Sequence, residues 1–514
     1  MANSGFATLL TVVTMKSALG VVTWLLMFVY PANAQAGWNE SYDFSLFSNQ
    51  FNTILVDNDT IVFVGISSGI DSPYIQSALV GRVDSFGQVL GFNTFTDSLG
   101  GYLAAGQNLI KTPDGGYAFH TAIIFRQTNA LYKFGKGLSL KSVYEFTDTV
   151  NLAVFYKGII ALEDGYLLAG IVQRPNHKYD SFVRKINAQG TTLWFKYYGI
   201  PDQGEHILGM SQLTDTAFVL YGSEGTSFTN PDELHSKIWI IDSSGIVLKT
   251  WSSPDSLKWM GVLELYPDES GNLFAFTRTF WGYNEWGDYI LQPTLVKFDT
   301  DLDIVWSKRF GPAHSSFSYW EDLRPTPDGN FIGVGKVAPY DLADLNAHLY
   351  GWLYKFTPEG DSIWARADLS TIPYQSGIDD NVFGGVDFLS SGSIVAGGNS
   401  YINGQFYGWI IKVTPDGCID TLLCQPLAAR PAAPVPAPAV FPNPASGQAY
   451  VRYSLPGGAE FQLYDAMGRL ALQQRLPGGD RQETLLLAGL ASGIYYWQIT
   501  AAGEMLAGGK LVLH

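Results

Sequence analysis

The sequence contains few cysteines, few charged residues and fewer bases than acids. Only 2 of its 514 residues are cysteine, 15% are charged, and 47 acidic against 31 basic side chains give a net charge of −16. Nucleic acids and anionic membranes are bound through basic surfaces, so this balance argues against both as partners. The two cysteines, Cys418 and Cys424, stand close together, and in an exported chain we expect them to form a small disulfide loop. A redox-active or metal-binding pair is the alternative.

The common catalytic motifs are also absent from the sequence. Its 7 histidines are scattered, and none has the His-Glu-x-x-His spacing of a zinc protease. There is no Gly-x-Ser-x-Gly elbow and no phosphate-binding Gly-Lys-Ser/Thr loop. We therefore expect no catalytic role, with an enzyme as the alternative.

Long apolar runs are missing except near the N-terminus. The apolar stretch 18–30 follows Lys16 and ends at Pro31-Ala32-Asn33-Ala34. A positive start, a short apolar core and small residues before the cleavage point predict a signal peptide over residues 1–34, cleaved between Ala34 and Gln35. The apolar stretch is short for a membrane anchor, which needs roughly 20 residues, and no other stretch is suited to crossing a bilayer. Translation starting at Met15 instead of Met1 would place the positive charge at the very start.

Glycine and aromatic residues are abundant and recur in a repeat. The clearest copy, Phe182–Trp194, is an alternating strand, a Gly-containing turn and a second strand carrying Trp, which predicts a β-hairpin. The copies follow one another at roughly 50 to 59 residues, in the range of solenoids, propellers and arrays. The other copies begin at Leu79–Asp84, Leu131–Phe134, Ile238–Asp242, Leu295–Asp299, Leu353–Phe356 and Ile410–Val413.

A second hairpin precedes each copy, so each repeat has four strands. Seven such repeats predict an all-β fold, a seven-bladed β-propeller over residues 35–424. The last repeat lacks the Trp-bearing fourth strand after Gly417, whereas Trp38–Tyr42 resembles such a strand. We expect this N-terminal strand to complete the last blade, which closes the ring and removes an exposed edge.

Two sets of residues are candidates for ligand binding on the loop face of the propeller. The segment 279–289 combines aromatic residues with an acid, as in a carbohydrate platform; the alternative is that its rings fold onto their own blade. Acids that recur just before first strands are expected to ring the channel mouth, where paired carboxylates also serve acid/base catalysis; turn capping is the alternative. The platform residues are Trp281, Tyr283, Trp286 and Asp288, and the acids are Glu205, Glu321, Asp322, Asp379 and Asp380.

Two further patterns have a structural and a functional interpretation. The alternating acids Asp299, Asp301 and Asp303 resemble a calcium loop, but they also occupy a hairpin turn, which favours a polar turn. A basic residue recurs near the end of six third strands, where it indicates either a repeated structural contact or a ring of cations for one ligand. These bases are Arg82, Lys133, Lys185, Lys297, Lys355 and Lys412.

The C-terminal part reads as a linker and a second domain. Residues 425–439 alternate Pro and Ala, which favours an extended spacer. Residues 440–514 contain several short strands at regular spacing, which predicts a small immunoglobulin-like β-sandwich.

Four motifs follow one another in the tail: Pro442-Asn443-Pro444, a turn with Asp465, Gly468 and Arg469, a strand with Gly493 and Tyr495, and a final strand with Lys510. With these motifs the tail resembles the type A C-terminal sorting domain of the type IX secretion system of Bacteroidota. This resemblance implies export through the signal peptide to the periplasm and passage across the outer membrane by the secretion machinery. It also implies cleavage of the tail by a sortase-like peptidase, with release or attachment to surface lipopolysaccharide.

The repeats themselves resemble those of quinoprotein-like propellers, since Trp194, Trp306 and Trp364 follow the turn glycine or its equivalent. The full consensus of those repeats is missing, so no quinone site is implied. We expect a secreted or cell-surface protein that binds a glycan or a protein on its loop face. The alternatives are an exported hydrolase or lyase acting on polysaccharide, and a passive structural surface protein.

Overall fold

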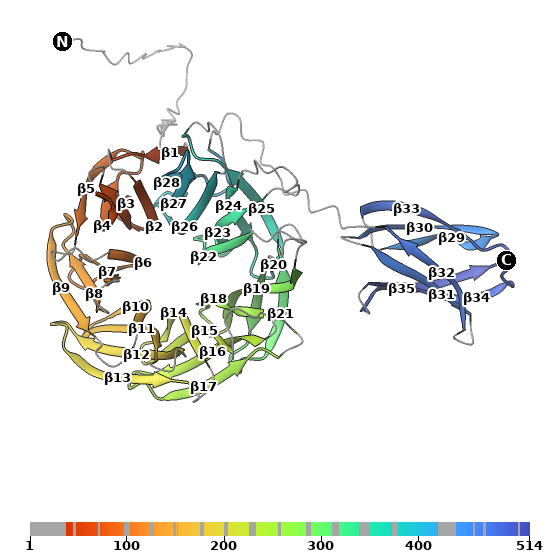
Figure 1. Cartoon of the computed structure of the whole chain (residues 1–514), viewed down its shortest axis with the longest axis horizontal. Helices are drawn as coiled ribbons and strands as arrows, with labels where there is room; N and C mark the ends of the chain where they lie inside the picture. Colours follow the sequence, from red (N-terminus) through yellow and green to blue (C-terminus); the bar gives the residue numbers. More distant parts are fainter. Residues whose placement is uncertain are drawn as a thin grey trace, which may run out of the picture. The chain divides into compact units, whose positions relative to one another are not determined.

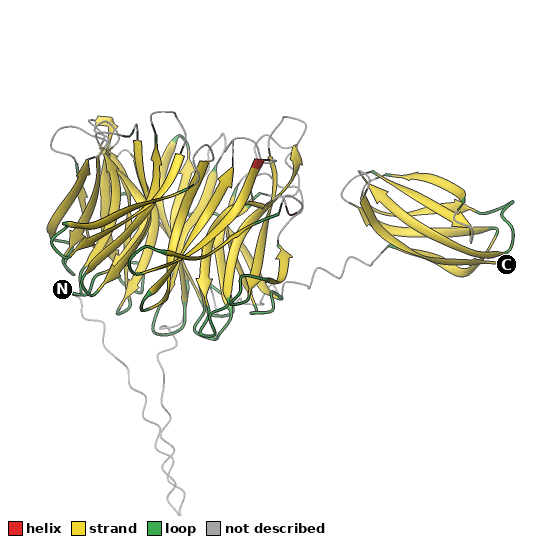
Figure 2. Cartoon of the chain, turned by 90° about the horizontal axis from the view of Figure 1, so that it is seen from below, coloured by secondary structure: helices red, strands yellow, loops and turns green. Residues whose placement is uncertain are grey.

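The fold is described from a computed structural model. It describes residues 37–514 with these gaps: 45–47, 70–71, 97–102, 124–127, 148–150, 152, 175–178, 200–203, 226–232, 255–256, 258, 284–288, 311–317, 339–348, 373–378, 420–437, 456–457, 466–468, 478 and 502–503. These residues are almost entirely strands and turns, so the protein is all-β (Figure 2). None of their helical segments is long and apolar enough to cross a membrane.

Up to Cys418, the described chain forms seven four-stranded antiparallel sheets like those of β-propellers. Each sheet contains consecutive strands, except that the seventh takes its fourth strand from the N-terminus. The first three sheets are β2 (Ser48–Asp57), β3 (Thr60–Gly69), β4 (Ser72–Val83) and β5 (Val89–Phe95); β6 (Leu103–Lys111), β7 (Tyr117–Ile123), β8 (Thr128–Phe134) and β9 (Leu140–Thr147); and β10 (Ala153–Leu162), β11 (Gly165–Gln173), β12 (Tyr179–Asn187) and β13 (Thr192–Tyr198).

The remaining four sheets continue this order. They are β14 (Gly204–Thr214), β15 (Ala217–Gly225), β16 (Leu234–Asp242) and β17 (Val247–Ser252); β18 (Trp259–Pro267), β19 (Leu273–Tyr283), β20 (Tyr289–Phe298) and β21 (Ile304–Arg309); β22 (Tyr319–Pro325), β23 (Phe331–Val337), β24 (Tyr350–Phe356) and β25 (Ser362–Asp368); and β26 (Asp380–Phe388), β27 (Ile394–Ile402), β28 (Gln405–Val413) and β1 (Trp38–Tyr42).

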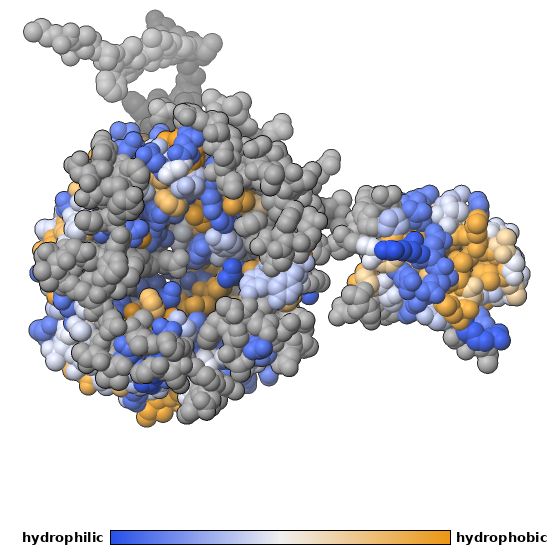
Figure 3. All heavy atoms as spheres, in the orientation of Figure 1, coloured by the Kyte–Doolittle hydropathy of each residue, from blue (hydrophilic) through white to orange (hydrophobic). Residues whose placement is uncertain are grey.

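The sheets form a closed ring with their first strands innermost (Figure 1). The first strands contact one another in the order β2, β6, β10, β14, β18, β22, β26, and β26 contacts β2 again. Apolar side chains fill the spaces between adjacent sheets, as where the rings of Phe276 and Trp320 from neighbouring sheets pack at 5.1 Å between centroids, tilted by 37°. The space-filling view shows a hollow in the middle of the ring (Figure 3). This hollow is called the channel below.

Strand β1 joins the last sheet to the first. It pairs antiparallel with β28, with Trp38 opposite Lys412. The Trp409 indole of β28 donates a hydrogen bond of 2.6 Å to Asn39 Oδ1. Two side chains of β1 also bind the turn that follows β4. Trp38 Nε1 donates to the carbonyl of Ser85 and the Tyr42 hydroxyl to that of Gly87, both at 3.0 Å. The strand therefore covers the edge of β28 and ties the two ends of the ring together.

The turns between third and fourth strands share one geometry. In the fourth sheet, Asp242 Oδ1 accepts hydrogen bonds from the amides of Ser244 and Ile246, and Gly245 has a φ of +78°. A positive φ of this kind lies in the left-handed region of the backbone. In two of these turns the residue in this region is a leucine, with a φ of +63° for Leu138 and +66° for Leu302. In the second sheet the position is thus taken by Leu138 and not by Gly137, the glycine of the repeat. Both leucines are buried, so packing compensates for the unfavourable backbone.

The C-terminal residues form seven strands around their own core. They are β29 (Ala439–Ser446), β30 (Gln448–Leu455), β31 (Ala459–Asp465), β32 (Leu470–Leu476), β33 (Gly479–Leu486), β34 (Gly493–Ala501) and β35 (Glu504–Leu513). Strand β29 pairs with β30 in its first half and, at Ala445, with Leu513 of β35. It therefore links the group β29, β30 and β33 to the group β31, β32, β34 and β35, and side chains from both groups share one buried cluster.

Candidate functional site in the channel

Every inner strand has an irregularity where its pairing with the second strand shifts register. In β10 the shift lies between Tyr156 and Gly158, and in β22 between Trp320 and Asp322. The skipped residues are Lys157 and Glu321. A bulge of this kind changes the direction of one side chain, so that it no longer follows the alternation of the strand between its two faces. At these two positions the bulges bring a base and an acid to the wall of the channel.

Lys157 and Glu321 interact across the channel. The inner strands β14 and β18 lie between β10 and β22 in the ring, yet the charge of Glu321 acts on Lys157. Lys157 is exposed to the solvent of the channel, but the surrounding walls desolvate its ammonium and lower its pKa, while Glu321 partly restores it.

Arg278 of β19 is a second cation near Glu321. Its guanidinium lies 5.7 Å from the ring centroid of Tyr319, and burial lowers its pKa against the opposing effect of Glu321. Its buried Nε has no hydrogen-bond partner among the described residues. The Tyr319 hydroxyl is hydrogen-bonded to Glu321, and burial followed by the charge of Glu321 raises its pKa.

Two histidines lie near Lys157. His120 of β7 is 4% exposed, and burial, with a smaller effect of Lys157, lowers its pKa to about 3. His206 of β14 has its pKa lowered to about 4 for the same two reasons, and its ring meets Tyr179 edge-on at 4.8 Å between centroids. Both imidazoles are neutral at pH 7 and offer N–H groups without charge.

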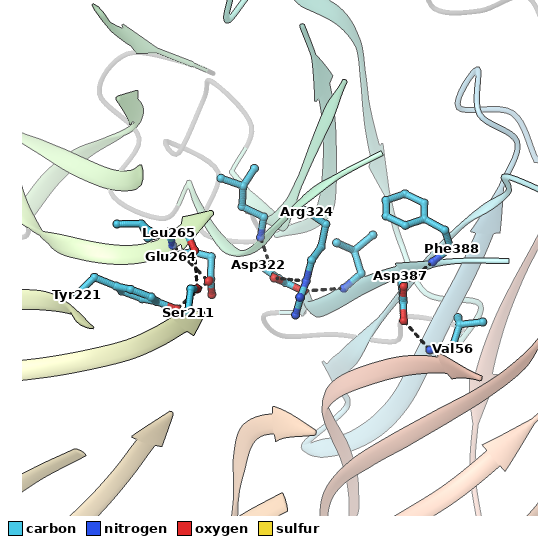
Figure 4. A network of polar contacts seen from close by, with 11 residues as sticks. Val56, Ser211, Tyr221, Glu264, Leu265, Asp322, Arg324, Asp387 and Phe388 are labelled. Carbon is cyan, nitrogen blue, oxygen red and sulfur yellow. Dashed lines mark hydrogen bonds and ion pairs between the residues drawn. The ribbon is translucent and has the colours of Figure 1, made fainter. Parts of the chain in front are cut away.

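Two other bases on or next to the inner strands are paired with aspartates. Lys336 Nζ of β23 lies 2.7 Å from Asp380 Oδ2, and Arg324 Nε lies 3.2 Å from Asp322 Oδ1. Asp322 also accepts hydrogen bonds from the amides of Leu323 and Val386, at 2.8 and 3.0 Å, so it links β22 to β26 (Figure 4).

Figure 4 also shows two further inner-strand acids that bind backbone amides. Asp387 accepts from Val56 of β2 at 2.6 Å. Glu264 of β18 accepts from its neighbour Leu265 at 3.2 Å and from the Tyr221 hydroxyl at 2.7 Å. Burial, followed by the nearby charge of Asp322, raises the pKa of Glu264 to about 7.

The structure separates the acids predicted for the channel mouth into two groups. Glu205, Asp322 and Asp379 are buried, with 2%, 6% and 3% of their surface exposed. Glu321 and Asp380 are only half-buried. Glu321 contributes to the group around Lys157, and Asp380 pairs with Lys336.

Four bases of the group around Lys157 and Glu321 were not identified from the sequence. They are Lys157, Arg278, His120 and His206. His206 follows the predicted Glu205 directly, which was the one available signal. A bulge cannot be placed from an isolated sequence, so nothing identified Lys157.

The aromatic segment is described only in part. Strands β19 and β20 pair as far as Tyr283 opposite Tyr289. Tyr283 is 51% exposed and contacts the rings of Phe280 and Tyr289, at 5.2 and 5.6 Å between centroids. Trp281 lies in β19, but its side chain is outside the described part, as are Trp286 and Asp288 entirely. The predicted carbohydrate platform stays a prediction.

Three of the six third-strand bases make ion pairs within their own sheets, and Lys297 lies over the ring of Phe274. Lys133, Lys185 and Lys355 each bind an aspartate of the turn between the first and second strands, namely Asp114 at 3.2 Å, Asp164 at 2.7 Å and Asp328 at 2.6 Å. Lys412 and Arg82 contact backbone carbonyls of neighbouring turns. These contacts favour the structural interpretation of the pattern over a ring of cations for one ligand.

The predicted calcium loop is a capped hairpin turn. Asp299 Oδ1 accepts from the amides of Asp301 and Asp303, both at 2.9 Å, and Asp301 pairs with Lys249 at 3.0 Å. Over the described residues, no group of three or more His, Cys, Asp or Glu side chains is placed to hold a metal ion. Calcium binding by Asp299, Asp301 and Asp303 stays a prediction. Cys418 is buried, and Cys424 lies outside the described residues, so the disulfide also stays a prediction.

The tail motifs serve the packing of the C-terminal strands. Asn443 donates to the carbonyl of Lys510 at 2.7 Å and accepts from Val512 at 2.9 Å. Arg469 binds Asp465 through Nε at 2.8 Å, and the Tyr495 hydroxyl donates to Ala491 at 2.9 Å. Pro442, Pro444 and Gly493 are exposed. Gly468 and the predicted cleavage pair Ala34 and Gln35 lie outside the described residues.

Comparison with known proteins identifies the tail. Residues 439–513 match the family model of the secretion system C-terminal sorting domain. The sorting domain is therefore confirmed, and it indicates export by type IX secretion to the cell surface or beyond, with the secretion machinery as a partner. No curated protein matches the chain.

Several solved structures are similar to the chain at low identity. A protein of unknown function from Bacteroides caccae is 14% identical, with a TM-score of 0.34 over 52% of this chain and 85% of that one. The polysaccharide lyase Uly1 is 9% identical, with a TM-score of 0.41 over 71% and 90%. A subtype N10 neuraminidase-like protein of A/little yellow-shouldered bat/Guatemala is 8% identical, with a TM-score of 0.33 over 74% and 98%.

Proposed function

We propose that this protein is a secreted or surface-held binding protein that recognises a glycan or protein ligand on the loop face of its ring, around the channel. In this proposal the seven four-stranded sheets are the blades of a β-propeller, and the tail is an immunoglobulin-like sandwich. One observation carries the proposal: five neighbouring sheets each contribute an ionisable side chain to one electrostatically linked group, whose member Lys157 is exposed on an inner strand. These residues are His120, Lys157, His206, Arg278 and Glu321.

This group supports binding because the side chain of Lys157, its exposed member, makes none of the contacts that hold the sheets together. Sheet-to-sheet contact is provided by apolar clusters and by acids such as Asp322 and Asp387, which bond to the backbone of the next inner strand. Lys157 contributes to neither and is exposed in the channel. Buried ionisable groups with shifted pKa values in a concave site are typical of functional sites.

The tail supports the location of this function outside the cell. We propose that residues 1–34 direct the chain to the periplasm and that the sorting domain then carries it across the outer membrane of a Bacteroidota bacterium. After cleavage of the tail, the ring is either released or attached to lipopolysaccharide. Tyr283, exposed at the end of its hairpin, is one surface on which a sugar ring would stack.

A glycan array combined with a reducing-sugar release assay tests the proposal on the purified ring. We expect binding without turnover, lost in Lys157→Met and kept in Lys249→Met. Lys249 is the matched control because it is a lysine on the outer strand β17, paired with Asp301. Equal binding by both variants would reject the channel as the site, and absence of any binding would favour a passive surface protein.

An exported hydrolase or lyase acting on polysaccharide is the second candidate, and Glu264 is the observation in its favour. A carboxyl whose pKa lies near 7 is suited to both donating and accepting a proton at neutral pH. Release of sugar products that disappears in Glu264→Gln would establish this candidate over the first.

A further inference from the structure

We infer that a cavity between the fourth and fifth sheets binds an alkylammonium ion, the chemical group at the end of a lysine side chain. The cavity has a volume of about 420 Å³, within the range of small-ligand pockets, roughly 300 to 1,000 Å³. Its lining residues come from the third strand β16 and from the turns between first and second and between third and fourth strands.

The cavity lies away from the site of the proposed function. Consecutive strands of a sheet alternate in direction, so the turns that line the cavity stand at one end of the sheets. The connections between second and third strands, which include the segment 279–289, stand at the other end. Most of the described turns, in green, gather along one edge of the ring (Figure 2). The inference is therefore independent of ligand binding on the loop face.

A smaller cavity occupies the equivalent place between the sixth and seventh sheets, with a volume of about 80 Å³. Its lining residues Thr326, Gly392 and Pro415 hold the positions of the repeat that Thr214, Gly271 and Thr300 hold around the larger cavity. The two cavities differ at the end of the third strand, where Lys355 lines the smaller one and Ile240 the larger. Ile240 stands at the position that holds a base in the other six repeats.

Lys355 shows what this place contains when it is filled. Its ammonium lies 2.6 Å from Asp328 Oδ2 and donates to the carbonyl of Pro415 in the next sheet at 3.1 Å. An isoleucine has neither the length nor the charge to make these contacts. The space that a lysine takes between the sixth and seventh sheets therefore stays open between the fourth and fifth.

Acidic residues line the open cavity. Asp268, Glu269 and Asp299, all from turns of the fifth sheet, contribute to its lining, and no base does so. In the seventh sheet the corresponding positions, matched by the hydrogen bonds of their turns, carry no charge. They are Leu389, Ser390 and Thr414. The larger cavity thus lacks the lysine of its smaller counterpart and has acids where that counterpart has none.

Glu269 is the acid of this lining that is available to a ligand. Asp268 and Asp299 cap the backbone amides of their own turns, whereas Glu269 is exposed and makes no ion pair or hydrogen bond with the described residues. The nearby Lys249 binds the Thr300 carbonyl and Asp301 Oδ1, both at 3.0 Å, from the outer strand β17. A concave site lined by charges of one sign attracts ions of the opposite sign, so this cavity attracts cations.

The floor of the cavity determines which cation fits. It is formed by Leu213, Ile240, Leu273 and Leu302, and the last three of these side chains are buried. An alkyl chain gains free energy by covering such a floor, whereas a bare metal ion does not. A lysine side chain combines an apolar stem with a charged end in the same way. A short alkyl chain that ends in an ammonium therefore matches both the floor and the acidic rim.

Titration of the full chain with n-pentylamine at pH 7 tests the cavity, with n-pentanol as the neutral ligand of similar shape. Followed by saturation-transfer NMR, the amine should bind at least five-fold more tightly than the alcohol, and Glu269→Gln should abolish this preference. Glu359→Gln is the matched control, because Glu359 is exposed in a turn of the sixth sheet. Equal binding of amine and alcohol to the wild type, or an unchanged preference in Glu269→Gln, would overturn the inference.

The variant Ile240→Lys supplies the missing ammonium within the chain. It should no longer bind n-pentylamine, whereas Ile240→Val, which keeps the cavity open and apolar, should bind it as the wild type does. Amine binding that persists in folded Ile240→Lys would overturn the inference, and Glu269→Gln decides the matter if Ile240→Lys does not fold. Lys157→Met should leave amine binding unchanged, which separates this site from the channel.

A second ligand identifies the source of the ammonium. Nα-acetyl-lysine amide carries the same alkylammonium group on a peptide-like backbone. If it binds more tightly than n-pentylamine, the cavity receives a lysine side chain of a partner protein, and if n-pentylamine binds more tightly, the ligand is a free amine. Either result supports the inference. Failure of both to bind would overturn it.

Discussion

The ammonium of Lys355 on β24 lies 2.6 Å from Asp328 Oδ2, and only 4% of the lysine side chain is exposed, against 49% for the aspartate. The same lysine donates to the carbonyl of Pro415 in the neighbouring sheet at 3.1 Å. A buried ammonium therefore joins two sheets and depends on one carboxylate for its charge balance.

Replacement of this carboxylate tests how much the buried pair contributes. We expect Asp328→Asn to lower the free energy of unfolding by about 2 kcal/mol, between the values for exposed and fully buried pairs. Asp164→Asn is the control, because Lys185, its partner, is more exposed. It should cost less than about 1 kcal/mol. Urea unfolding of both variants measures the difference, and equal losses would contradict this account.

The same aspartate predicts a loss of stability in acid. Burial opposes ionisation of Asp328, but hydrogen bonds from Lys355 and Thr326 prevail and lower its pKa to about 2. Because the folded state holds this proton less tightly than the unfolded state, its contribution is complete above about pH 4 and is lost as the pH falls towards 2. Asp328→Asn should therefore have a flatter stability profile than the wild type from pH 4 to 2. If the stability of both proteins fell equally between pH 4 and 2, the ion pair of Asp328 with Lys355 would not be the cause of the loss in acid.

Glu264 predicts the opposite dependence at neutral pH. Its pKa is raised to about 7, so the folded state binds a proton that the unfolded state releases near its ordinary pKa of about 4.3. Stability from this group is present at low pH and lost as the pH rises through 7. We expect Glu264→Gln to lose less stability than the wild type between pH 5 and 8, measured by urea unfolding. The amide oxygen introduced by Glu264→Gln can still accept hydrogen bonds from Tyr221 and Leu265, so the variant changes the charge and keeps these contacts. A loss of stability between pH 5 and 8 that is larger in the variant than in the wild type would contradict the raised pKa.

Leu302 predicts an unusual order of glycine and alanine variants. It has a φ of +66° and is buried, so Leu302→Ala loses packing and keeps the backbone strain, whereas Leu302→Gly relieves that strain. Both should be destabilised, but the glycine variant less, by about 1 kcal/mol. Leu295, buried within β20, is the control, and there the glycine variant should be the less stable one. The same order at both positions would refute the strain at Leu302.

Much of this fold could be predicted from the sequence because hairpins leave local signals. Turn residues such as Asp242 and Gly245 perform the capping that their types favour. The absence of a Trp after Gly417 pointed to Trp38–Tyr42, and β1 indeed pairs with β28. The positive φ of Leu138 could not be predicted, because it is set by the burial of this side chain between sheets and not by the intrinsic preference of leucine.

The charged residues around Lys157 and Glu321 could not be predicted from the sequence, for two physical reasons. The bulges at Lys157 and Glu321 depend on pairing with the second strand, which an isolated strand does not reveal. The electrostatic interaction of these two residues depends on closure of the ring, which places β10 and β22 around the same channel although they are far apart in sequence. Acids were visible as a pattern before the first strands, whereas the bases that give the site its charge came from different positions in each repeat.

The channel is the central claim of this account, and Lys157→Met tests it most directly. Calorimetric titration of the wild type, Lys157→Met and Lys249→Met should be carried out with a ligand found on the glycan array. The account predicts that affinity falls at least ten-fold in Lys157→Met and is unchanged in Lys249→Met. Unchanged affinity in Lys157→Met, with the ring still folded, would contradict it.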